Sequence, residues 1–298
     1  MEFTWTYSKE SPQLLRGFIR DCGISKQLLA KIKFQGGKIQ VDGVERTVRF
    51  EIQQGQVLKI IVPDEKEHES MLSDDVPIDI LFEDDHLLLV NKPAGVASIP
   101  AQYHPNGTMA NRVKGYYKKQ GYRNQVIHIV TRLDRDTTGL MLFAKHGFAH
   151  AQMDVLLREK RIEKRYKALV AGDIAKLRKT KDIIAPIDRD YDSLIKRTVA
   201  ETGKAAHTEY FIEEATDDLA LVDIRLHTGR THQIRVHFEY TGSPLLGDDM
   251  YGGRMDLGIE RQALHCGRLI FVHPFTGEKL DFHQDLPEDM KAVLENYF

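Results

Sequence analysis

The run His86-Leu87-Leu88-Leu89-Val90-Asn91 is a nearly continuous stretch of apolar residues. An apolar run of this length without alternation is typical of a strand that is buried on both faces at the centre of a sheet. Further strands are predicted at residues 78–82, 140–144, 166–171, 208–213, 220–226 and 268–272. With helices predicted at 109–120 and near 148–158, the pattern indicates an α+β domain with a mixed, mainly antiparallel central sheet and flanking helices.

A smaller α+β unit is predicted before this domain, over residues 1–63. Apolar residues at helical spacing indicate two short helices, and Ser25 stands where it can cap the second. After residue 37 the hydrophobic period changes to two, which predicts a small hairpin sheet with strands at 38–41 and 56–62.

Charge is unevenly distributed along the 298 residues, although the formal net charge is only −2. Residues 1–63 carry ten Lys/Arg against six Asp/Glu, and residues 64–85 carry ten Asp/Glu and one lysine. The acidic, turn-rich segment 64–77 has little to bury, which predicts a linker, and residues 78–298 are then the larger domain. The basic segments can bind a polyanion or be ordinary solvated faces.

Composition excludes several classes of protein. No apolar run approaches the roughly 20 residues that cross a bilayer, and a signal peptide is not recognisable, so we expect a cytoplasmic chain with no membrane partner. Cys22 and Cys266 are isolated, which excludes a disulfide framework. Dinucleotide, P-loop, serine-hydrolase and H-E-x-x-H motifs are missing. The five-residue spacing of His232 and His237 does not place them on one helix face, so no metal is expected.

The densest run of chemically active residues is Thr131-Arg132-Leu133-Asp134-Arg135-Asp136-Thr137-Thr138. It is predicted to form a loop between buried elements, where catalytic groups are often displayed on a rigid frame, although a salt-bridged turn would use the same residues. Two further runs are equally ambiguous. Residues 164–170 place an aromatic ring among cations, for base stacking or as an edge tyrosine. Residues 228–237 form a glycine turn and a helix start, for an anion or as a simple cap.

Taken together, five ordered motifs resemble the RluA/RluD class of RNA pseudouridine synthases from about residue 78 to the end. They are V-N-K-P-A-G at 90–95, R-L-D-R-D-T-T-G-L at 132–140, K-R-Y-K-A-L-V at 164–170, T-G-R-T-H-Q-I-R-V-H at 228–237 and L-G-D at 246–248. The unit at 1–63 resembles the S-four-like RNA-binding module that often precedes this class. One departure is Thr131, where the class usually has His, which puts the local support of the loop in question.

The resemblance implies an enzyme that breaks the N1–C1′ bond of a uridine in RNA, turns the base and rejoins it through C5, without a cofactor. It assigns the catalytic carboxylate to Asp134 and its charge partner to Arg235. It also implies that Arg132 fills the gap left by the flipped base, and that Tyr166 is a catalytic residue that packs against the uracil and could also serve in proton transfer at C5. Asp136 is expected to be structural. The other residues expected to contact RNA are Asn91, Lys92, Arg230, His232, Gln233, Arg16, Arg20, Lys26, Lys31 and Lys33.

Two alternative functions remain open at this point. Asp134 and Asp136 could be the carboxylate pair of a glycoside hydrolase, although neighbouring positions on one loop fit its spacing poorly. The chain could also be a non-catalytic RNA-binding factor of ribosome assembly, against which the intact catalytic motifs argue. The RNA partner is expected to be large-subunit ribosomal RNA, with transfer RNA as the alternative, and no obligatory protein partner is evident.

Overall fold

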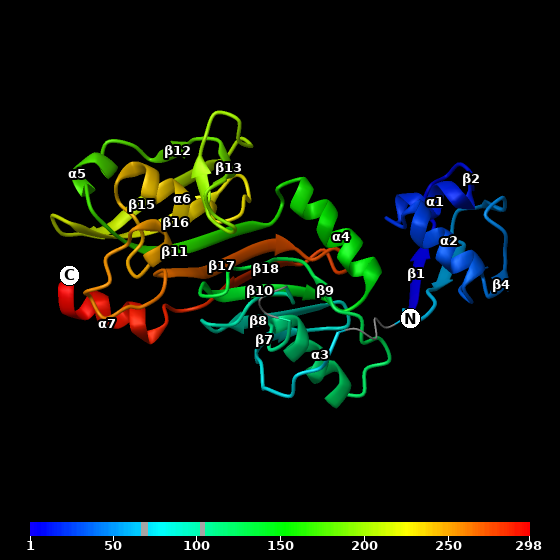
Figure 1. The fold of residues 1–298 in the computed structure, drawn as a ribbon. Coiled ribbons are helices and arrows are strands. Elements are labelled where there is room, and N and C mark those ends of the chain that lie inside the picture. The colour runs from blue at the N-terminus through cyan, green and yellow to red at the C-terminus, as the bar shows by residue number, and fades with distance from the viewer. Residues whose placement is uncertain (67–70, 102–104) are drawn as a thin grey trace.

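The computed structural model describes residues 1–66, 71–101 and 105–298, and in it a small N-terminal unit lies beside a larger unit (Figure 1). The strands of the larger sheet are β7 (Asp79–Glu83), β8 (Leu87–Lys92), β9 (His128–Ile129), β10 (Thr138–Ala144), β11 (Glu163–Ala171), β12 (Asp182–Ile184), β15 (His207–Ala215), β16 (Leu219–Leu226), β17 (Leu264–Val272) and β18 (Lys279–His283). Their order is β12-β15-β16-β11-β17-β10-β8-β7, with β18 on β17 and β9 on β10. Only β10 and β17 pair in parallel. The expected α+β class with a mixed, mainly antiparallel sheet is confirmed.

Helices and a separate hairpin complete the larger unit. They are α3 (Met109–Lys119), α4 (Gly147–Arg158), α5 (Ile174–Leu177), α6 (Gln233–Thr241), the 3-10 helix η1 (Asp249–Tyr251), α7 (Glu288–Tyr297), and the strand pair β13 (Ile187–Arg189) and β14 (Arg197–Val199). Across the described residues, no helix has both the length and the apolar content that a bilayer crossing requires.

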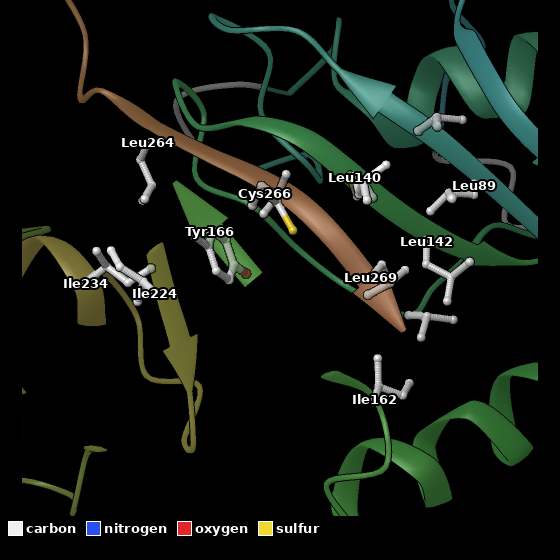
Figure 2. Packing of buried hydrophobic residues seen from close by; sticks show 14 of the residues in the cluster. Leu89, Leu140, Leu142, Ile162, Tyr166, Ile224, Ile234, Leu264, Cys266 and Leu269 are labelled. Carbon is white, nitrogen blue, oxygen red and sulfur yellow. The ribbon is translucent and has the colours of Figure 1, made fainter. Parts of the chain in front are cut away.

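Strands β8 and β10 are the most buried strands of the large sheet, as the apolar run at 86–91 predicted, but β8 lies next to the edge strand β7 and not at the centre of the sheet. Residues 87–90 of β8 and all seven residues of β10 are buried, and the two strands pair with Leu89 opposite Leu142. Figure 2 shows side chains of both strands packed with Leu269 and Cys266 of β17. Burial of one such leucine stabilises the fold by about 1.5–3 kcal/mol, so these strands form a rigid frame for the segments that join them.

Gly139 fixes the distance between β10 and β17. Its φ is +106°, and a Cβ atom there would lie 2.3 Å from the carbonyl oxygen of Cys266. Only glycine permits this close approach of two backbones. The segment that precedes Gly139 is therefore held at a defined position over β17.

The N-terminal unit (residues 1–63) has the helix, helix and hairpin sheet that the sequence predicted. Its elements are β1 (Glu2–Thr6), β2 (Gln13–Leu14), α1 (Leu15–Asp21), α2 (Lys26–Phe34), β3 (Lys38–Val41), β4 (Val44–Glu45), β5 (Glu51–Ile52) and β6 (Val57–Ile61). The Ser25 hydroxyl accepts a hydrogen bond from the Leu28 N–H and caps α2, as expected. Strand β1 was not predicted, and it joins the sheet edge by pairing with β6.

Phe3 of β1 links the N-terminal unit to the larger unit. Its ring packs edge-on against Phe148 at 4.9 Å between centroids and stacks with Phe275 at 5.8 Å. Close by, the Gln152 side-chain amide of α4 donates a hydrogen bond of 2.8 Å to the Gly23 carbonyl. The N-terminal unit is therefore docked on the start of α4.

The described part of the predicted linker 64–77 is also held on the larger unit. Glu65 accepts a hydrogen bond of 2.7 Å from the Gly147 N–H and lies 2.9 Å from His128 Nε2. Burial raises the pKa of Glu65, but His128 and the Gly147 N–H outweigh this effect and lower it to about 2. Residues 67–70 of the predicted linker lie outside the described residues.

Candidate active site

A cavity of about 730 Å³ lies where three segments that are far apart in the sequence meet. The segment from 130 to 137, called here the Asp134 loop, forms one wall, and residues 157–166 and 226–235 form the others. This volume falls within the range of ligand-binding pockets, about 300–1,000 Å³. Asp134, Arg132, Tyr166 and Arg235, which sequence reasoning selected from three motifs, all line it.

Two side chains lie near the same oxygen of the Asp134 carboxylate. Its Oδ2 lies 3.7 Å from Arg235 Nη1 and 4.0 Å from His232 Nε2. About a third of the side chain is exposed, and Oδ1 has no hydrogen bond within the described part of the chain. One carboxylate oxygen is thus held by the protein while the other is available to a ligand in the cavity.

Arg235 of α6 is oriented by a second carboxylate. Its Nε and Nη2 donate to Asp248 at 2.6 and 2.7 Å, and both side chains are buried. The guanidinium also lies over the Tyr251 ring, 4.8 Å from its centroid. Burial lowers the pKa of Arg235, but Asp248 outweighs this effect and raises it, so the side chain stays charged. The role of Asp248 was not predicted, although the L-G-D motif at 246–248 was the available signal.

His232 presents one defined nitrogen to Asp134. It adopts a left-handed conformation with φ +55° at the start of α6. Its Nδ1 lies 2.9 Å from the Tyr251 hydroxyl, which accepts a hydrogen bond from the Arg197 N–H. A neutral ring that carries its proton on Nε2, toward the Asp134 carboxylate, leaves Nδ1 to accept from the Tyr251 hydroxyl. Burial lowers the pKa of His232, so the neutral ring with Nε2–H toward Asp134 is favoured.

Neighbouring segments support the Asp134 loop through its backbone. The Ser98 hydroxyl donates to the Leu133 carbonyl at 2.6 Å and accepts from the Leu133 N–H at 3.0 Å. The Thr131 hydroxyl accepts from the Leu142 N–H at 2.9 Å, so the residue that departs from the class pattern still anchors the loop. Arg261, which pairs with Asp289 of α7, donates to the Asp136 carbonyl at 3.1 Å.

Lys92 does not have the position that its predicted contact with RNA requires. It is fully buried, and its ammonium donates to the carbonyls of Pro93, Val96 and Arg135 at 2.7–2.8 Å. Burial lowers its pKa to about 7, against the attraction of Asp136 and Asp134. A side chain in this position cannot contact RNA, so the prediction of an RNA contact was wrong. Lys92 instead ties the Asp134 loop to β8.

Two further residues predicted to contact RNA are occupied within the protein. The Asn91 amide donates to Asp79 at 3.0 Å, and Asn91 is not part of the cavity wall. Gln233 is buried; its carbonyl oxygen accepts from the Arg230 N–H and the Thr228 hydroxyl, and its amide donates to backbone and side-chain oxygens. Gln233 is corrected to a structural group, because its hydrogen-bonding capacity is used inside the chain. Asn91 is partly exposed and makes this one side-chain hydrogen bond within the described residues, so its RNA contact stays a prediction.

Several predicted cations are free to meet a polyanion. Arg132 is exposed on the cavity wall and has no hydrogen bond or ion pair within the described residues. The Arg230 side chain is exposed and, within the described residues, donates only to the Ala205 carbonyl. Lys160, which was not singled out from the sequence, adds another cation to the wall. In the N-terminal unit, all five predicted cations of α1 and α2 are exposed: Arg16, Arg20, Lys26, Lys31 and Lys33.

Tyr166 and Asp136 differ in their relation to the cavity. Tyr166 lies in the wall, and burial together with the neighbouring Cys266 raises its pKa well above 10, so the hydroxyl stays protonated. Asp136 is absent from the wall, and Arg135 donates to both of its oxygens at 2.9–3.1 Å. This position supports the predicted structural role of Asp136.

No group of three His, Cys, Asp or Glu among the described residues is arranged to hold a metal ion.

Comparison with known proteins gives one family. Residues 86–240 match the family model described as RNA pseudouridylate synthase. An uncharacterized RNA pseudouridine synthase of Bacillus subtilis, YjbO, is 45% identical, over 94% of this chain and 98% of that protein. A ribosomal large subunit pseudouridine synthase D of Vibrio parahaemolyticus is 37% identical, over 87% and 82%. The solved structure of human RNA pseudouridylate synthase domain containing 4 aligns with 73% of this chain and with 92% of its own chain. The TM-score is 0.59 and the sequence identity is 24%, so the two proteins share the fold.

Proposed function

Because the chain belongs to the RNA pseudouridylate synthase family and is an RNA pseudouridine synthase, we propose that it modifies a uridine of large-subunit ribosomal RNA in the cavity around Asp134. The observation that supports this proposal is that one cavity is lined by Asp134, Arg132, Tyr166 and Arg235. The choice of RNA is supported by the name of the Vibrio relative, a ribosomal large subunit pseudouridine synthase.

The uridine must leave its stack to reach the cavity, which costs a few kcal/mol. We assign the filling of the vacated position to Arg132, because it is exposed at the cavity and has no partner within the described residues. The Tyr166 ring then stacks on the uracil, an interaction worth about 1–3 kcal/mol per base in other systems. These two side chains together offset the cost of unstacking.

Asp134 acts on the sugar side of the broken bond. Cleavage of N1–C1′ leaves C1′ electron-poor, and Oδ1 of Asp134 is available to stabilise or bind that carbon. Arg235, fixed by Asp248, attracts Oδ2 and holds the carboxylate in place. The uracil then turns and forms the C5–C1′ bond, C5 loses its proton and N1 gains one, so the atoms balance without a co-substrate.

The cations of α1 and α2 bind phosphates away from the cavity. Arg16 and Arg20 are one helical turn apart, and Lys26 and Lys33 are two turns apart, so each pair shares a face. Contacts of this kind position an RNA without reading its sequence. The docked N-terminal unit thereby sets which part of a structured RNA reaches the Asp134 loop.

Tritium release tests the proposal. Ribosomal RNA labelled at uracil C5 is prepared from cells that lack the gene and incubated with the enzyme. We expect the wild type to release tritium from 23S RNA while the strand stays unbroken, and mapping to find one uridine or a small set of uridines converted. Release from transfer RNA alone would overturn the choice of RNA, and undiminished release by Asp134→Asn would overturn the assignment of the site.

A further inference from the structure

Lys164 differs from every other cation on β11. Side chains alternate across a strand, so Lys164 and Tyr166 share the face of the cavity, whereas Arg165 and Lys167 lie on the opposite face. On that face Arg165 pairs with Glu163 and Asp223, and Lys167 pairs with Asp223 and Glu213. Lys164 has no hydrogen bond or ion pair within the described residues.

Among the described residues, no carboxylate forms an ion pair with Lys164 that could balance its charge. Most of the side chain is buried, and the burial lowers its pKa from the usual 10.5. Its one titratable neighbour is Cys266, a buried thiol whose own pKa is raised to about 12 by burial. Tyr166, which is hydrogen-bonded to Cys266 and packs beside it (Figure 2), is also protonated. An unpaired buried ammonium costs several kcal/mol, so its position calls for a function.

The reaction itself generates the missing anion, and this step of the argument rests on the proposed function. When the N1–C1′ bond breaks, its electron pair stays with the uracil, and the negative charge spreads over N1, O2 and O4. The base stacked on Tyr166 is then next to Lys164, because the two residues are adjacent on one face of β11. We propose that the Lys164 ammonium stabilises the uracil anion while the base turns from N1 to C5.

The chemistry of lysine suits this role. Its ammonium has three donors on a flexible stem and can follow O2 and O4 as the ring turns. The interaction exists only after the bond has begun to break, so it lowers the barrier instead of tightening the binding of uridine. Lys164 keeps its own proton throughout: the C5 proton leaves to water, and N1 takes one from water.

Single-turnover tritium release and RNA binding test this inference with three variants. Lys164→Met removes the charge and keeps an unbranched side chain, Lys164→Arg keeps the charge, and Lys167→Met is the matched control on the opposite face. We expect Lys164→Met to slow release about 100- to 1,000-fold, the loss typical of one oxyanion donor, without weakening RNA binding. Lys164→Arg should retain most of the rate, and Lys167→Met all of it.

The pH profile separates the alternatives. The wild-type rate should fall at alkaline pH as the ammonium is lost, and the rate of Lys164→Arg should not. An equally inactive Lys164→Arg, with a wild-type rate that rises with pH, would make Lys164 a base and overturn the inference. Weaker RNA binding with an unchanged single-turnover rate would make it a phosphate contact. If Lys164→Met fails to fold, the wild-type and Lys164→Arg profiles still decide. Wild-type inactivity on ribosomal RNA would instead refute the proposed substrate.

Discussion

Arg235 is bound by Asp248 through two nitrogens, at 2.6 and 2.7 Å, in a pair that is almost entirely shielded from solvent. The remaining nitrogen, Nη1, faces Asp134 at 3.7 Å. Asp248 therefore fixes the position of the positive charge that attracts the Asp134 carboxylate. A structural ion pair in the core and the electrostatics of the cavity depend on the same guanidinium.

Replacing Asp248 by Asn should harm both stability and rate. Removal of one partner from a buried pair typically costs about 3–5 kcal/mol, and Asn, which retains one acceptor, should fall near the lower end. Arg235 would then swing toward Asp134, so we expect a lower single-turnover rate with RNA affinity preserved. Urea unfolding and tritium release measure the two effects. A stable variant with full activity would show that Asp248 does not position Arg235.

Asp134 and Asp136 form a matched pair of carboxylates on one loop. Only Asp134 reaches the cavity, whereas Asp136 is held by Arg135. Asp134→Asn should abolish pseudouridine formation and leave RNA binding nearly intact. Asp136→Asn should keep most of the activity, because its contacts are with a neighbouring exposed side chain. The two roles would be exchanged if Asp136→Asn lost all activity with a normal melting curve while Asp134→Asn remained active.

Lys92→Met tests whether Lys92 holds the Asp134 loop. Three carbonyls would lose their donor, and each buried unsatisfied group costs about 1–3 kcal/mol, so a clear loss of stability is expected. The rate should also fall, because the Arg135 carbonyl is released one residue from Asp134. The dependence of RNA binding on salt should stay as in the wild type. A shallower salt dependence with normal stability would restore Lys92 as a phosphate contact.

Acid should weaken the contact between the N-terminal unit and the larger unit. His146, which packs against Phe3, accepts a hydrogen bond from the Ala149 N–H on Nδ1, and its Nε2 lies 3.0 Å from His86 Nδ1. Burial lowers the pKa of His146 to about 3. The unfolded chain takes up this proton near pH 6.5 and the folded chain does not. The contribution of neutral His146 to the stability of the fold is therefore complete above pH 6.5 and is lost as the pH drops from 6.5 toward 3.

Glu65 adds to the same trend at lower pH. Its folded pKa of about 2 lies below the usual 4.5, so its contribution is complete above pH 4.5 and is lost between 4.5 and 2. Between pH 6.5 and 5, before Glu65 contributes, we expect urea unfolding to show a loss of about 2 kcal/mol from His146. His146→Asn supplies an oxygen that can cap α4 and that does not titrate, so this variant should show a weaker pH dependence of stability between pH 6.5 and 5. An unchanged slope in the variant would assign the loss to other groups.

The sequence predicted the parts of the fold that are set by local periodicity and missed those that depend on distant partners. The apolar run 87–90 identified a buried strand because burial on both faces leaves no alternation, but it did not give the position of that strand beside the edge strand β7. Strand β1 alternates Glu2, Phe3 and Thr4, a visible signal, yet its place depends on pairing with β6, which lies more than 50 residues later. Helix α7 was missed because only Met290 and Val293 mark its buried face.

In the candidate site, too, the sequence predicted some features and missed those that depend on distant partners. The order of the motifs, and the resemblance that it carries, selected Asp134, Tyr166 and Arg235, and the structure places all three on the wall of one cavity. The burial of Lys92 could not be predicted, because the carbonyls that accept its protons come from the following loop and from the Asp134 loop, which only the folded chain brings together. A lysine in a motif looks the same whether it binds phosphate or backbone. Burial, which is a tertiary property, distinguishes the two.

The exposed lysines of α2 provide the last test, which concerns RNA affinity apart from chemistry. Lys26, Lys31 and Lys33 have no ion pair within the described residues, so each is free to displace a counterion from a phosphate. For single-stranded RNA, each phosphate contact contributes a slope of about 0.7 in log K against log salt. Replacing all three by Gln should therefore weaken binding at low salt and reduce the slope by up to about 2, while the single-turnover rate at saturating enzyme stays the same. Lys59, which pairs with Glu2 in the same unit, is the control, and Lys59→Gln should change neither quantity. An unchanged slope in the triple variant would mean that α2 does not face the RNA.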